Sequence, residues 1–158
     1  MEWMKNDLQQ FVQAKEYVDT AIVPLLPFQL SYDASLEKDA FQSEAQAVFL
    51  RELERELTGR IMMIPGYRYL KSADKESELN RLRTWIRDIQ AQPFFHVFFI
   101  TSDSGWKKHE QALPGTLIWL PLTAGNDSDP ENMQPIIKEQ VGEVSDLIKS
   151  YWHDDLKT

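Results

Sequence analysis

Residues 94–100 read Phe-Phe-His-Val-Phe-Phe-Ile, and this stretch limits the folds open to the chain more than any other. Six of its seven residues are apolar, so it lacks the polar and apolar alternation of a strand with one face in water. A continuous apolar run of strand length predicts a central strand that is covered on both faces. The chain therefore needs a helical layer on each side of its sheet.

The rest of the chain alternates helix-like and strand-like segments. Apolar residues at helical spacing predict helices at 7–16, 35–57, 76–90 and from 129 or 134 onward. Apolar or β-branched runs that end at proline or glycine predict further strands at 17–27, 60–66 and 115–122. We expect residues 67–70 to form a loop and residues 107–113 to add a single helical turn.

This order predicts a single α/β domain of 158 residues with three layers. Its sheet would be mainly parallel and four-stranded, Rossmann-like or flavodoxin-like, with helices on both faces. Right-handed crossovers place the predicted strands in the order 2-1-3-4. About fourteen residues separate the third and fourth strands, which allows either a short crossover or an antiparallel edge strand. The direction of the fourth strand therefore stays open.

Composition excludes several classes of site. Cysteine is absent, so disulfides, thiol nucleophiles and thiolate metal sites are excluded. The net charge of −8 argues against nucleic-acid binding, which needs a basic surface. The apolar runs fall short of the ~20 residues that span a bilayer, and the amino terminus does not read as a signal peptide. We therefore expect an acidic cytoplasmic protein.

Standard catalytic motifs are missing as well. There is no glycine-rich dinucleotide fingerprint, no phosphate-binding loop, no acidic pair at the end of the first strand and no Gly-x-Ser-x-Gly elbow. His109 and His153 have no partner at metal-ligand spacing, and His96 inside the central strand is interpreted as a hydrogen-bonded core residue. We assign no catalytic residue, no metal and no cofactor.

A candidate ligand site follows from the sheet order. In open α/β sheets, ligands bind beyond the carboxyl ends of the strands, where the strand order reverses. Here that crevice would lie between the first and third strands, and its aromatic walls, hydroxyls, carboxylate and arginine would suit a small polar or nucleoside-like ligand. The candidate ligand-binding residues are Tyr32, Tyr67, Arg68, Thr101, Ser102, Asp103, Ser104 and Trp106.

Two alternatives stay open at this crevice. Arg68 is expected to reach across it, either to pair with Asp103 or to clamp an anionic ligand. Thr123 would join from the loop after the fourth strand. The plainer interpretation is that residues 102–105, Ser-Asp-Ser-Gly, are only a turn. Of the five tryptophans, Trp106 and Trp152 are expected to be the least buried.

Residues 17–27, Tyr-Val-Asp-Thr-Ala-Ile-Val-Pro-Leu-Leu-Pro, are preceded by Trp3 and by Phe-Val-Gln-Ala at 11–14. This pattern resembles the YpiF-like family of uncharacterised proteins from Bacillus-type bacteria, and the resemblance extends over nearly the whole chain. It implies a bacterial cytoplasmic protein of unknown activity. The matching stretch holds no catalytic motif, so no functional residue is transferred.

Two functions from different classes fit these observations. The first is a non-enzymatic interaction or assembly protein with an unknown protein partner. It is favoured by the missing motifs and by charge asymmetry, since residues 51–87 hold nine Lys/Arg against six Asp/Glu and residues 125–158 hold three against eight. The alternative is a small-molecule or nucleotide-binding or processing domain that uses the crevice. A deep pocket at Tyr32, Arg68 and Asp103, or a strongly raised carboxylate pKa there, would favour the alternative. The oligomeric state stays open.

Overall fold

A computed structural model describes residues 1–122 and 130–155 of the chain. Its α-helices are α1 (Lys5–Gln13), α2 (Leu36–Glu56), α3 (Lys75–Ile89) and α4 (Gln134–Asp155). Its strands are β1 (Thr20–Phe28), β2 (Ile61–Met63), β3 (Tyr67–Leu70), β4 (His96–Thr101) and β5 (Thr116–Trp119). Short 3-10 segments are η1 (Lys15–Tyr17), η2 (Asp33–Ser35), η3 (Ser104–Ala112) and η4 (Pro130–Met133). Within these residues no helix combines the length and the apolar character needed to cross a bilayer.

The strands form a parallel sheet in the order β2-β1-β4-β5, which confirms the α/β class and the predicted order. The fourth predicted strand, β5, runs parallel to β4 and so resolves the direction left open above. β3 was wrongly expected to be a loop. β1 is nine residues long while β2 pairs with only its first three, so the same edge of β1 is free for β3 farther along.

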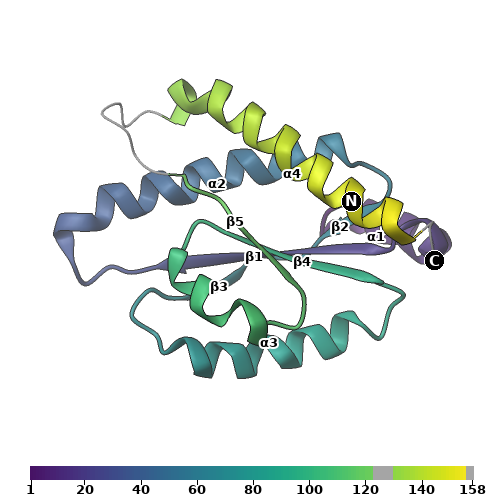
Figure 1. Ribbon diagram of the computed structural model, residues 1–158, viewed down its shortest axis with the longest axis horizontal. Coiled ribbons are helices and arrows are strands. Elements are labelled where there is room, and N and C mark those ends of the chain that lie inside the picture. Colours follow the sequence, from purple (N-terminus) through teal and green to yellow (C-terminus); the bar gives the residue numbers. More distant parts are fainter. Residues whose placement is uncertain (123–129, 156–158) are drawn as a thin grey trace.

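Two helices cover each face of the sheet. α2 and α4 pack on one face, while α3 and α1 pack on the other (Figure 1). In β4, Phe98 and Ile100 face α2 and α4, whereas Val97 and Phe99 belong to the opposite core. Both faces of β4 are thus apolar, as the continuous run at 94–100 predicts. Phe95 is an exception, because it precedes β4 and its side chain is 76% exposed.

His96 lies at the amino end of β4, opposite the end at which a ligand site was predicted. Its side chain is buried, and Nε2 lies 2.6 Å from Oδ2 of Asp155 at the end of α4. The ring also meets Tyr151 edge-on, with 6.4 Å between the ring centroids. The interpretation of His96 as a hydrogen-bonded core residue is confirmed, and the contact fastens the end of α4 to the sheet.

We expect His96→Gln to lower the free energy of unfolding by about 1–2 kcal/mol, because the exchange weakens one hydrogen bond to a charged group. Urea denaturation measures this change. His153→Gln is the matched control, since His153 is exposed on the same helix that His96 fastens. Any ligand bound at the other end of the sheet should bind His96→Gln as it binds the parent protein. Lost binding with unchanged stability would place His96 in a site.

Candidate functional site at the carboxyl ends of the strands

A crevice of about 190 Å³ opens where the strand order reverses, between α2 and the carboxyl ends of β1 and β4. It is lined from β1 by Leu26, Pro27 and Phe28, from α2 by Lys38, Asp39, Gln42 and Ser43, and from the segments after β3 and β4 by Lys71, Ser102, Asp103 and Ser104. Three candidate residues, Ser102, Asp103 and Ser104, therefore share one cavity. That they bind a ligand remains a prediction.

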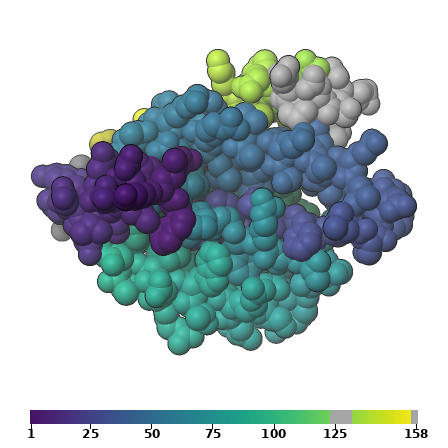
Figure 2. Space-filling view, turned by 180° about the vertical axis from the view of Figure 1, so that it is seen from behind, coloured from purple at the N-terminus to yellow at the C-terminus, as the bar shows by residue number. Residues whose placement is uncertain are grey.

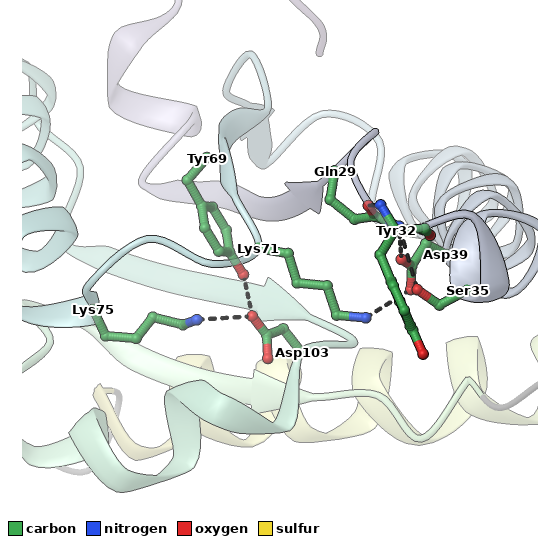
Figure 3. A network of polar contacts seen from close by, with 8 residues as sticks. All are labelled: Gln29, Tyr32, Ser35, Asp39, Tyr69, Lys71, Lys75 and Asp103. Atoms are coloured by element: carbon green, nitrogen blue, oxygen red, sulfur yellow. Dashed lines mark hydrogen bonds and ion pairs between the residues drawn. The ribbon is translucent and has the colours of Figure 1, made fainter.

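Asp103 is the centre of a partly buried polar network at this edge of the sheet (Figure 3). Its Oδ2 accepts a 2.5 Å hydrogen bond from the Tyr69 hydroxyl and lies 3.1 Å from Nζ of Lys75. Its Oδ1 accepts from the backbone N–H of Gly105 at 2.9 Å, which caps η3. The indole N–H of Trp106 donates to the Tyr69 oxygen at 2.8 Å and closes the network.

These contacts determine the protonation of the network. Burial by itself raises the pKa of Asp103, but the hydrogen bonds from Tyr69 and Gly105 and the charge of Lys75 outweigh it and hold the pKa below its ordinary value. Burial and the adjacent carboxylate raise the pKa of the Tyr69 hydroxyl. Asp103 is therefore an ionised acceptor near neutral pH, and Tyr69 is a neutral donor.

A second network fixes the loop between β1 and α2. The Gln29 amide accepts from the backbone N–H of Tyr32 at 2.9 Å and donates to Oδ2 of Asp39 at 2.9 Å. Oδ1 of Asp39 binds Nζ of Lys71 at 2.8 Å (Figure 3). Burial raises the pKa of Asp39, but the bonds from Lys71 and Gln29 outweigh it and lower the pKa. The loop after β1 is thereby tied to the first turn of α2 and to the segment after β3.

Large apolar side chains nevertheless face solvent at this ordered end. Leu30 is 81% exposed and Tyr32 65% exposed, and Phe28 and Leu70 are also exposed. Phe28 and Leu70 are register partners in the parallel pair of β1 and β3, so they lie side by side. We call these four residues the apolar tip. Figures 1 and 2 show the loop after β1 and the start of α2 at one end of the molecule, far from the amino terminus.

The two predicted site residues on β3 lie away from the crevice. Tyr67 is buried, and its hydroxyl donates to the buried carboxylate of Glu78 on α3. Arg68 is exposed on β3 and does not line the crevice. The expected pairing of Arg68 with Asp103 is wrong, because Lys75 at the start of α3 contacts that carboxylate instead. The strand geometry of β3 gives the reason: alternate side chains point to opposite faces, so Tyr67 and Tyr69 turn inward and Arg68 turns outward.

The remaining candidates have structural contacts. Thr101 is buried and donates to the Leu25 carbonyl at 3.0 Å, so it joins the ends of β1 and β4. Trp106 is fully buried, which contradicts the expectation that it would be among the least buried tryptophans. η3 folds it back onto Tyr69 instead of leaving it on an open loop. Tyr32 belongs to the apolar tip, and Thr123 lies outside the described residues.

Gln46 is a contributor that sequence reasoning missed. It is buried on α2, where its amide donates to the Ile100 carbonyl at 3.2 Å and accepts from the Ser102 hydroxyl at 3.2 Å. It therefore fixes both the end of β4 and the orientation of Ser102. The only sequence signal is a glutamine at a core position, between Ala45 and Phe49 on the apolar stripe of α2.

Comparison with known proteins agrees with the resemblance seen in the sequence. Residues 9–152 match the family model described as "Protein of unknown function (DUF2487)". The chain is 30% identical over 156 residues to "Uncharacterized protein YpiF" of Bacillus subtilis (strain 168), covering 96% of this chain and 98% of that protein. No solved structure matches the chain. The chain thus belongs to the DUF2487 family of proteins of unknown function.

Proposed function

We propose that this chain is a non-enzymatic interaction protein that binds a protein partner through the apolar tip. The observation that carries the proposal is the combination of exposure and order at this end of the molecule. Leu30 and Tyr32 are mostly exposed, yet the Gln29 amide bonds both the backbone N–H and the carbonyl of Tyr32. Several large apolar side chains exposed on neighbouring segments are typical of interaction surfaces.

A loop that is ordered before the partner binds favours a higher affinity for that partner. A partner that buries the apolar tip gains free energy from the apolar area removed from water. A loop that is already fixed by Gln29, Asp39 and Lys71 loses little conformational entropy on association, so more of that gain remains as binding free energy. The two networks therefore support partner binding as well as folding.

Charge next to the tip indicates the chemistry of the partner. Arg68 is exposed two residues before Leu70 on the same side of β3. An acidic side chain beside the partner's apolar residues would pair with it. We therefore propose a partner segment that carries exposed apolar residues next to an Asp or Glu.

The ionisation of the two crevice carboxylates also favours an interaction protein over an enzyme. Asp39 and Asp103 each contact a lysine ammonium, and both have lowered pKa values. Neither carboxyl group is therefore poised to give up a proton near neutral pH, as a general acid must. Tyr32 and Arg68 do not line the cavity, so it differs from the deep pocket at Tyr32, Arg68 and Asp103 that would favour a processing enzyme.

The test places a photocrosslinking amino acid at position 30 and, as control, at position 147, in cells of the organism that encodes the chain. Leu147 is likewise an exposed leucine, but it lies on α4. We expect a defined protein to crosslink from position 30 and not from position 147. That protein is then purified and its affinity for the parent chain measured.

The double variant Leu30→Ser/Leu70→Ser should bind this purified partner at least about thirtyfold more weakly, as expected when interface hot spots are lost. Its free energy of unfolding should change by no more than about 0.5 kcal/mol per exposed site. Arg68→Ala should weaken binding mainly at low salt, because an exposed charge pair is screened by salt. Unchanged affinity of the double variant would sink the proposal.

A further inference from the structure

We propose that the crevice at the strand ends binds a small zwitterion of the amino-acid class, with one ammonium and one carboxylate group. This inference is separate from the proposed function, since the partner would cover the apolar tip and the small ligand would enter the cavity beside it. Phe28 belongs to both surfaces. A bound ligand would therefore lie directly next to the partner's binding surface.

Size limits the ligand first. The cavity volume of about 190 Å³ is below the roughly 300–1,000 Å³ of pockets that hold drug-sized molecules or nucleotides. Its lining is rich in hydroxyl, amide and charged groups, so an apolar fragment of the same size would leave these groups without partners. A small, highly polar metabolite is the class that fits.

The wall from β4 presents acceptors. Ser102 uses its hydroxyl proton in the bond to the Gln46 side chain, so the lone pairs of its oxygen remain for a donor. Asp103 follows it in the chain and is ionised. Its two oxygens already accept from Tyr69, Lys75 and Gly105, and a carboxylate has about four acceptor positions in all. Ser102 and Asp103 together would receive the ligand's ammonium group.

The wall from α2 presents a free cation. Lys38 lines the crevice, and no hydrogen bond or ion pair engages its ammonium among residues 1–122 and 130–155. Lys71, the other lysine of the lining, is already paired with Asp39. Lys38 is therefore the lining group that would receive a carboxylate.

The charges of the lining favour a ligand with both signs. The lining holds two lysines, Lys38 and Lys71, and two carboxylates, Asp39 and Asp103. A zwitterion adds no net charge to this balanced set, whereas a simple amine or a simple carboxylate does. Lys75 adds one positive charge from outside the lining, which makes a simple carboxylate the main competitor. The experiment must therefore separate these two ligand classes.

Isothermal titration of the full chain with each of the twenty common L-amino acids tests the proposal. The concentration should reach about 10 mM, ten times the dissociation constant of a weak millimolar ligand. Propionate and propylamine serve as probes that carry only one of the two charges. We expect saturable binding of at least one amino acid. Propionate and propylamine should each bind at least about tenfold more weakly than that amino acid, because each lacks about one charge-assisted hydrogen bond.

Lys38→Gln should weaken amino-acid binding by roughly tenfold or more and leave the unfolding midpoint unchanged, since Lys38 is exposed. Lys108→Gln, an exposed lysine on η3 outside the crevice, should bind as the parent does. Three results would each overturn the inference: no amino acid binds, propionate binds as tightly as the best amino acid, or Lys38→Gln keeps full affinity. None of these results bears on partner binding at the tip.

Discussion

Replacing Phe98 by alanine is expected to lower the free energy of unfolding by about 3–5 kcal/mol. Phe98 is 1% exposed in the middle of β4, with β1 on one side and β5 on the other. Its ring meets Tyr151 of α4 edge-on at a centroid distance of 5.2 Å. Neither the sheet nor α4 can shift into the space of the lost ring without breaking other contacts, so the exchange leaves a cavity. Urea denaturation at constant pH measures the loss.

Phe95→Ala is the matched control, with the same exchange three residues earlier in the chain. The Phe95 ring is largely exposed, so its removal should change stability by about 0.5 kcal/mol or less. A small effect at position 98, or equal effects at both positions, would contradict the central placement of β4. The pair thus separates burial from side-chain type.

The layers and the strand order could be predicted from the sequence because each depends on the apolar pattern of whole segments and not on single residues. The apolar run at 94–100 requires cover on both faces, and connections of helical length between strands favour parallel pairing. Element boundaries depend on single contacts. Residues 17–19 have strand composition, but η1 and Val18 precede β1, and Tyr17 is exposed.

β3 was missed because four residues between a Pro-Gly pair and a lysine carry little strand signal. The pattern Tyr-Arg-Tyr-Leu does alternate between aromatic and other side chains, and Tyr67 and Tyr69 are indeed both buried while Arg68 and Leu70 are exposed. Recognising this period of two would have predicted that Arg68 points away from Tyr69. The expected pairing of Arg68 with Asp103 would then have been dropped.

The polar parts of the site depend on residues that are distant in sequence. Ser102, Asp103 and Ser104 could be placed at a strand end because they follow the central strand directly. Their partners could not be identified, since Lys75 and Gln46 come from two different helices and any exposed lysine or glutamine would have matched as well. The burial of Trp106 could not be predicted for a similar reason. The residues before it have the composition of a turn, but Asp103 among them also caps η3, and η3 places the indole in the core.

Asp103→Ala is expected to lower the free energy of unfolding by about 3 kcal/mol at pH 7, the lower end for breaking a buried ion pair. The Asp103 and Lys75 side chains are 18% and 15% exposed, so solvent screens the pair only in part. The exchange also leaves the Tyr69 hydroxyl and the Gly105 N–H without their acceptor. Asp146→Ala, at an exposed site on α4, is the control and should have a small effect.

The pH dependence of this loss carries a definite sign. Because the pKa of Asp103 is lower in the folded chain than in the unfolded chain, its ionised form stabilises the fold above the unfolded pKa of about 3.9. That contribution is lost as the pH falls through the folded pKa. Urea curves should therefore show the full difference between parent and Asp103→Ala at pH 7 and pH 5, and a shrinking difference below about pH 4. A difference that stays constant down to pH 2 would show that the carboxylate charge is not what stabilises the fold.

Tyr69→Phe tests the same network, because it removes one donor to Asp103 and the acceptor of the Trp106 indole N–H while it leaves the ring in place. Alone it should lower the free energy of unfolding by at least about 1.5–3 kcal/mol, the value of a hydrogen bond to a charged group, because the buried Trp106 N–H also loses its acceptor. The double variant should be less destabilised than the sum of the two single variants by at least about 0.5 kcal/mol, since both single exchanges remove the same bond. Additive losses would mean that the Tyr69 and Asp103 side chains stabilise the chain independently, and that the crevice wall beside Ser102 is not held by one network.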